Sequence, residues 1–253
     1  NILLNEIVHD SSFIKRTVYS IDTRMKSSIN KKDWEDVIYI ASDGGHLSIC
    51  KYFDLIMDSI NNLYPIRNAT RNGNLELCKH FISIIKIDEY KLSLLSIVAA
   101  QNGHLKLVMY YVSIGATNYN EAFRYAAWGG HLKICKYLAS INVTKFGRAL
   151  NGAAYYGHLD VCKYLVSLGT PINNWTLICA VYGNNLNMCK YLISNNTFSN
   201  EALDESLYLC KCDIERLAIK EYMISIGAVE QKGLTWTLKM ESRHMRPSWM
   251  ELF

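Results

Sequence analysis

Histidine and cysteine recur four residues apart in this chain, a spacing that can bind a metal ion. The pairs are His46/Cys50, His131/Cys135 and His158/Cys162. On a helix, residues i and i+4 lie on one face, and imidazole and thiolate are both zinc ligands. A zinc site needs three or four ligands, however, and pairs in neighbouring helical layers would lie about 10 Å apart. Asn74 and Asn185 hold the same position as these histidines. We therefore predict a structural role, with each side chain bonding backbone groups at a turn, and no metal site.

Other chemical motifs do not stand out. Cys210-Lys-Cys212 has no second cysteine pair, the serines lack a glycine elbow, and no glycine-rich phosphate loop is present. We expect no catalytic residue and no cofactor.

Lysine recurs in one register, directly after the repeated cysteine. The series is Lys51, Lys79, Lys136, Lys163 and Lys190. One interpretation is a solvated face with packed aliphatic stems. The other is a stripe that binds nucleic acid or an acidic protein. The net charge of +4 and the isoelectric point near 8.5 are mild, so we do not expect nucleic acid as the main partner.

These residues all belong to one repeated phrase, Gly-His-Leu-x-x-Cys-Lys-Tyr. The second residue of the phrase is histidine or asparagine in each copy, at intervals of 28, 30, 27, 27 and 27 residues. These residues are His46, Asn74, His104, His131, His158 and Asn185. A period in this range indicates stacked supersecondary units. The residue before each of them is expected to adopt the left-handed backbone of a turn. These turn residues are Gly45, Gly73, Gly103, Gly130, Gly157 and Asn184.

Each unit contains two helix-length apolar patterns. Between residues 119 and 139, Ala122, Phe123, Ala126 and Ala127 give the stripe of a first helix, and Ile134, Cys135 and Leu138 that of a second. Five of the eight cysteines hold one register, which Val108 holds in the remaining copy. Because cysteine and valine exchange there, we predict buried, reduced thiols and not disulfides.

The run Ala-Ala-x-x-Gly-His-Leu-x-x-Cys-x-x-Leu resembles the second half of an ankyrin repeat, over about residues 35–228. It is similar in particular to the divergent arrays of large DNA viruses and amoebae. The unit is shorter than the family's usual length of about 33 residues, and the Thr-Pro-Leu-His signature is missing. The resemblance implies an all-α helical solenoid of about six to eight helix-turn-helix repeats with short inter-repeat loops.

Four segments are predicted. Residues 1–33 are interpreted as a degenerate N-terminal repeat or cap, 34–200 as the array, 201–228 as a degenerate C-terminal capping repeat, and 229–253 as a tail without repeats. Charged residues of the capping repeat, among them Asp204 and Arg216, are expected to form a polar outer face.

The apolar stretch Leu92 to Ala100 is too short to cross a bilayer, and the opening residues do not resemble a signal peptide. We expect an intracellular protein, in the cytoplasm or nucleus, without membrane contact. The chain begins with Asn1 and not Met, which is compatible with a fragment.

The candidate partner surface is the part of the repeat that varies. Just before each turn, where the resemblance to ankyrin proteins implies the concave side, the chain changes freely and offers large side chains. The candidates are Arg71, Gln101, Trp128, Tyr155, Tyr156 and Tyr182, with Asn120 and Arg148 at the flanks. An alternative is that these rings pack between repeats.

We therefore predict a non-catalytic module, monomeric alone, that binds a protein partner on this face. Two alternatives remain: an adaptor that delivers a bound protein to a ubiquitin ligase, and weak nucleic-acid binding through the lysines.

Overall fold

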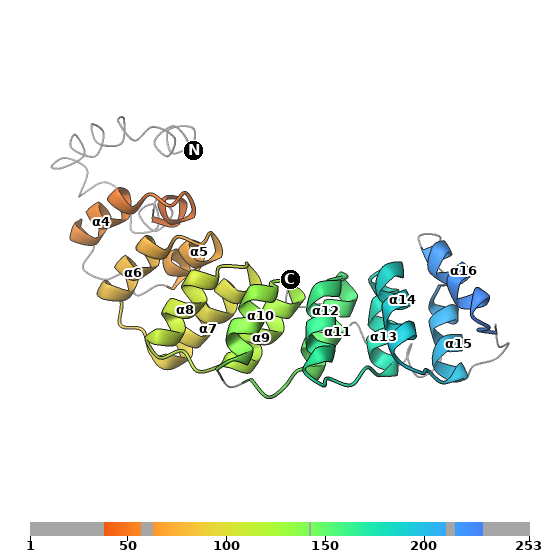
Figure 1. The fold of residues 1–253 in the computed structure, drawn as a ribbon. Helices are drawn as coiled ribbons and strands as arrows, with labels where there is room; N and C mark the ends of the chain where they lie inside the picture. Colours follow the sequence, from red (N-terminus) through yellow and green to blue (C-terminus); the bar gives the residue numbers. More distant parts are fainter. Residues whose placement is uncertain (1–37, 57–62, 142, 211–215, 230–253) are drawn as a thin grey trace, which may run out of the picture. The chain divides into compact units, whose positions relative to one another are not determined.

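The computed structural model describes residues 38–56, 63–141, 143–210 and 216–229. Within these ranges the chain is helical and contains no strand, which confirms the all-α prediction (Figure 1). The predicted N-terminal cap and all of the predicted tail except Val229 lie outside the described residues. The chain divides into two compact units, Asn1–Thr170 (unit 1) and Pro171–Phe253 (unit 2), and each is described by itself.

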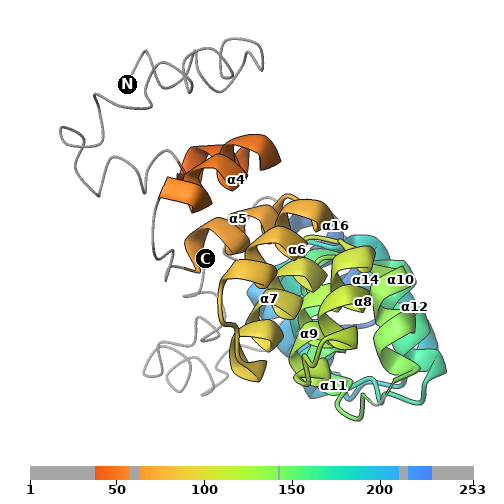
Figure 2. The same ribbon diagram turned by 90° about the vertical axis from the view of Figure 1, so that its left-hand side faces the viewer.

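Unit 1 is a stack of paired helices. Helical residues 38–43 precede α4 (Leu47–Ile56), and the following pairs are α5 (Tyr64–Arg71) with α6 (Leu75–Ile84), α7 (Glu89–Gln101) with α8 (Leu105–Ser113), α9 (Tyr119–Trp128) with α10 (Leu132–Ala139), and α11 (Gly147–Tyr156) with α12 (Leu159–Ser167). α7 packs against α5 and α9, and α9 also packs against α11. α10 packs against α8 and α12. The first helices therefore form one layer and the second helices another, as Figure 2 shows from the end. This arrangement confirms the predicted helical solenoid.

The turn inside each pair has one repeated geometry. Gly130 adopts φ +74°, and Asn184, where the glycine is replaced, adopts φ +55°. The amide of the next residue then reaches back across the turn, so that His131 N–H donates to the carbonyl of Ala126 at 2.9 Å. This left-handed residue reverses the chain and satisfies a carbonyl that the end of the first helix would otherwise leave open.

The core runs between the two layers. The predicted stripes around Phe123 and Cys135 are buried, as is the alanine pair of each complete first helix from α7 to α11. Each cysteine in the described ranges is a buried thiol, which confirms the predicted core thiols for these positions. Burial raises the pKa of Cys135 to about 12, with a smaller contribution from Asp160. The thiol therefore stays neutral and packs as a small apolar side chain.

Unit 2 repeats the same pairing. It contains α13 (Asn174–Tyr182), α14 (Leu186–Asn195), α15 (Asn200–Leu209) and α16 (Leu217–Ser225). α13 packs against α14 and α15, and α16 packs against α15 and α14. In unit 2, as in unit 1, the first helices of successive pairs therefore pack against each other, and so do the second helices.

Two of the charged residues expected on a polar outer face of the last repeat, Asp204 and Arg216, are not exposed. Asp204 is buried and accepts a hydrogen bond from Val229 N–H at 2.9 Å, and Arg216 is half-buried. Leu217 and Ile224 are instead 54 % and 53 % exposed. The reason is that both charged side chains bond backbone groups: Asp204 within its own repeat, and Arg216 both within its repeat and in the one before.

Candidate functional site

The turn histidines of unit 1 connect neighbouring repeats. His104, His131 and His158 are each the N-cap of a second helix, and the Nε2 of each lies within hydrogen-bonding distance of a carbonyl near the end of the preceding repeat's first helix. The pairs are His104 with Arg71 (2.7 Å), His131 with Gln101 (2.9 Å) and His158 with Trp128 (2.8 Å). Because a carbonyl can only accept, Nε2 carries the proton. The backbone group that each histidine bonds thus belongs to the preceding repeat and not to its own turn.

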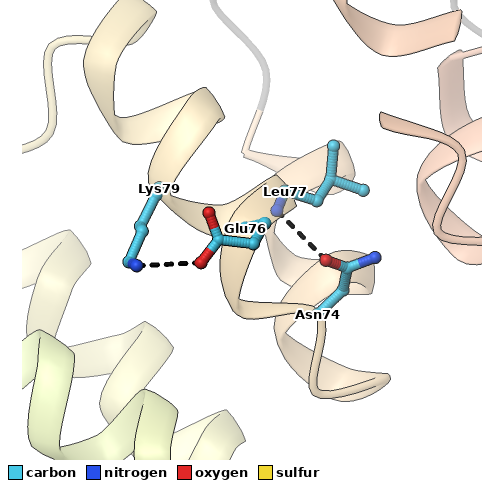
Figure 3. A network of polar contacts seen from close by, with 4 residues as sticks. All are labelled: Asn74, Glu76, Leu77 and Lys79. Carbon is cyan, nitrogen blue, oxygen red and sulfur yellow. Dashed lines mark hydrogen bonds and ion pairs between the residues drawn. The ribbon is translucent and has the colours of Figure 1, made fainter. Parts of the chain in front are cut away.

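Asparagine makes the corresponding connection one step earlier. Asn72 Nδ2 donates to the Asp43 carbonyl at 2.8 Å, and Asn74 Nδ2 donates to the Gly45 carbonyl at 3.3 Å. Asn74 Oδ1 also accepts from Leu77 N–H at 3.1 Å and so caps α6 (Figure 3). One amide side chain therefore caps its own helix and bonds the previous repeat.

Arg216 takes the place of the histidine in unit 2. It is the N-cap of α16, and its guanidinium donates to the carbonyls of Tyr182 (3.2 Å) and Leu209 (3.1 Å). This role of Arg216 was not predicted from the sequence, although a signal was present. Gly227 follows Arg216 by 11 residues, as Gly115 follows His104. We use the name N-cap bonds for the bonds to the preceding repeat that are made by the N-cap residues His104, His131, His158 and Arg216.

The His–Cys pairs therefore divide between two structural tasks, with the histidine at the turn and the cysteine in the core. In the ranges that the structure describes, no group of three or more His, Cys, Asp or Glu residues is placed to hold a metal ion. Cys212 lies outside those ranges.

Protonation of His131 should weaken unit 1. Burial lowers the pKa of His131; the nearby His158 and His104 act in the same direction, and the bond to the Gln101 carbonyl opposes them. The folded state thus favours the neutral ring, so its contribution is present above the ordinary pKa of about 6.5 and is lost as the pH falls. We expect His131→Asn, the residue found at positions 74 and 185, to reduce the loss of stability between pH 7.5 and 5.5. Urea denaturation at both pH values measures this, and an unchanged difference would contradict it.

The outward side of the first-helix layer follows from the register. On α5, α7, α9 and α11, the positions 9, 6 and 2 residues before the turn glycine lie opposite the buried face of the helix, and we call these positions on the four helices the front stripe. Its members are Tyr64, Arg67 and Arg71 on α5; Leu94, Ile97 and Gln101 on α7; Glu121, Arg124 and Trp128 on α9; and Arg148, Asn151 and Tyr155 on α11. Tyr64, Arg67, Arg71, Leu94 and Arg148 are exposed, and most of the others are half-buried.

Trp128 is the exception, and the expectation that it centres a contact surface is corrected. Only 6 % of the residue is exposed. Its Nε1–H donates to the Arg148 carbonyl at 3.3 Å, and the Arg124 guanidinium lies 5.0 Å from its ring. The ring occupies space that Gly152 leaves free, since a Cβ there would overlap with the indole. The alternative interpretation, that the ring packs between repeats, therefore holds for this residue.

Asn120 is also engaged within the fold. Its Oδ1 accepts from the backbone N–H groups of Thr144 (3.1 Å) and Lys145 (3.2 Å). The side chain therefore fixes the loop that leads into α11, and we remove it from the contact set.

The other candidates in unit 1 lie at the surface. Tyr156 is 40 % exposed, and its ring meets that of Tyr155 edge to face at 4.9 Å. Arg71 and Arg148 are exposed, and Gln101 is half-buried. Tyr182 belongs to unit 2, where it is partly exposed beneath the Arg216 guanidinium, 5.5 Å from its ring.

The family model described as ankyrin repeats (3 copies) matches residues 97–175 and 123–204. Residues 97–204 match ankyrin repeats. A comparison with curated proteins gave no match. Across the described ranges, no helix has both the length and the apolar character needed to cross a membrane.

The lysine register lies on the second helices of the helix pairs, and all five lysines are exposed. Lys79 pairs with Glu76 at 2.8 Å (Figure 3). Lys136 Nζ lies 5.8 Å from the ring of Tyr164, and Lys190 Nζ lies 5.5 Å from that of Tyr222. In both pairs the tyrosine comes from the second helix of the next helix pair. Cation–π attraction of this kind stabilises stacking, which is a structural use of lysines otherwise open to nucleic acid.

Proposed function

We propose that this chain is a non-catalytic protein-interaction module that binds a protein partner through the front stripe and the adjoining Tyr156. Ankyrin repeats are in general protein–protein interaction modules. The observation that carries the proposal is the contrast between the two faces of the first helices. The buried face repeats small residues such as Ala99, Ala126 and Ala153, whereas the front stripe changes from repeat to repeat and exposes arginine and tyrosine.

The composition of this surface suits binding. Arginine and tyrosine are enriched among the residues that dominate interface energies, because they bury a large area and lose little conformational entropy. Arg71, Arg148 and Tyr156 are the exposed members that we expect to contribute most. The N-cap bonds hold successive first helices in register, so little ordering is needed when the partner binds.

The test is affinity capture followed by calorimetry with the partner so identified. We expect Arg71→Ala, Arg148→Ala and Tyr156→Ala together to weaken binding by about 100-fold or more, since each interface residue of this kind contributes about 1 kcal/mol or more. The control variant carries Lys51→Ala, Lys106→Ala and Lys133→Ala on the exposed second-helix side. Equal binding by both variants, with unchanged melting, would refute the proposal.

Finer assignments extend this proposal. The face that we assign is the one that is concave in ankyrin proteins, and we propose a monomer in the cytoplasm or nucleus, without membrane contact. Delivery to a ubiquitin ligase would require a second binding segment, and we find no feature in the described residues that favours one. The similarity to arrays of large DNA viruses and amoebae stays a prediction.

A further inference from the structure

The front stripe carries unbalanced positive charge. Arg67, Arg71 and Arg148 are exposed, and among the described residues none of their side chains has an ion-pair partner. The single acidic member of the stripe, Glu121, is ion-paired with Arg124. Within the stripe, the charged side chains without an ion-pair partner are therefore the three arginines.

Acidic side chains beside the stripe are already bonded within the fold. At the start of α7, Asp88 pairs with Lys91 at 3.6 Å, and Glu89 accepts from the Thr117 hydroxyl at 2.6 Å. Asp43, which precedes the first described turn, accepts from Asn72 Nδ2 at 3.0 Å. These carboxylates have protein partners, whereas the three arginines do not, which leaves the arginines to a partner.

We propose that the protein partner presents an acidic segment that lies across α5, α7, α9 and α11; this rests on the function proposed above. Carboxylates of the segment would pair with Arg67 and Arg71 at one end and with Arg148 at the other. Guanidinium groups bind carboxylates through two parallel hydrogen bonds, which favours arginine for such pairs. Between the two ends, α7 offers the apolar side chains of Leu94 and Ile97.

The spacing sets the length of the segment. Three steps of about 10 Å separate α5 from α11, or about 30 Å. An extended chain advances about 3.3 Å per residue, so the segment needs about nine residues between its two acidic ends. Its middle should be apolar where it crosses Leu94 and Ile97.

Nucleic acid fits this surface less well. A nucleic-acid backbone carries a charge at every phosphate and is bound by grooves that track it with positive charge. Of the two central helices of the front stripe, α7 contributes Leu94, Ile97 and Gln101, none of which is charged, and the charges of α9 form the Glu121–Arg124 ion pair. Two separated cationic ends match an acidic peptide with an apolar centre.

The experiment uses a fluorescein-labelled peptide of about 13 residues, with three glutamates at each end and leucine and serine between. Controls are the same peptide with lysine in place of glutamate and a single-stranded DNA oligonucleotide of equal charge. The full chain is compared with two variants, Arg67→Gln/Arg71→Gln/Arg148→Gln and Lys51→Gln/Lys106→Gln/Lys133→Gln, which lose the same charge from opposite layers. Circular dichroism melts check that both variants fold.

We expect the acidic peptide to bind the wild-type chain and the lysine variant within twofold, and the arginine variant at least tenfold more weakly. The lysine peptide should not bind. No binding of the acidic peptide, equal loss in both variants, or DNA binding of equal strength would overturn the acidic class of partner. If the acidic class is overturned but Tyr156→Ala no longer captures the partner, the protein-interaction function proposed above still holds. If Tyr156→Ala captures the partner as the wild-type chain does, that function is contradicted as well.

Discussion

Gly152→Ala should destabilise unit 1 by about 3 kcal/mol, at the upper end of the usual cost of overpacking a core. A Cβ at this position would overlap with Nε1 and Cδ1 of Trp128. The indole is buried and its N–H donates to the Arg148 carbonyl, so it cannot move aside without losing that bond. Chemical denaturation monitored by tryptophan fluorescence measures the change.

The matched control is Gly147→Ala in the same helix. Nothing lies within 4 Å of a Cβ at position 147, so we expect a change of less than about 1 kcal/mol, in the direction of greater stability. Combining Gly152→Ala with Trp128→Ala should cost less than the sum of the two single changes, because each removes the reason for the other's loss. Equal effects of the two glycine substitutions, or strict additivity of the pair, would contradict the packing described for Trp128.

Cys135→Asp should unfold the central repeats or cost at least about 3 kcal/mol at neutral pH, because it places an unpaired carboxylate in the core. Cys135 has no exposed surface, and Ile134 and Leu138 on the same helix are also buried. Circular dichroism melts compare the variant with the wild-type chain.

Two comparisons isolate the charge. Cys135→Val should be nearly neutral, since Val108 fills the same register with no exposed surface. Burial would raise the pKa of an aspartate at position 135, so its neutral form costs less and the variant should lose less stability, relative to wild type, near pH 5 than at pH 7.5. A cooperative, wild-type melt of Cys135→Asp at neutral pH would show that this register does not lie in the core.

The repeat register alone predicts most of the fold. The step from Gly130 to Asn184 at equivalent turns predicted a left-handed backbone, and both residues adopt positive φ. The exchange of Cys135 for Val108 predicted a buried position, and both are buried. These inferences succeed because they depend on contacts inside one unit, which recur in each copy.

Features that depend on contacts between particular repeats could not be read in the same way. Trp128 and Tyr155 share one register, yet the tryptophan is buried because Gly152 in the next repeat leaves room for its ring. Arg216 was expected at a polar surface, but its length lets it reach the Tyr182 carbonyl that a histidine would bond elsewhere. The repeat register therefore predicts the position of a residue on its helix, whereas the neighbouring repeat determines the burial and the partners of its side chain.

The central claim is that the turn side chains of unit 1 join each helix pair to the one before it, which holds the first helices in register for binding. Long-range ¹H–¹⁵N NMR of the imidazole rings at about pH 7.5 tests it directly, because the neutral ring has two distinguishable tautomers. The account predicts that His104, His131 and His158 all carry the proton on Nε2, donated to the carbonyls of Arg71, Gln101 and Trp128. Protonation on Nδ1 in these histidines would contradict it, since Nε2 could then not donate to the preceding repeat.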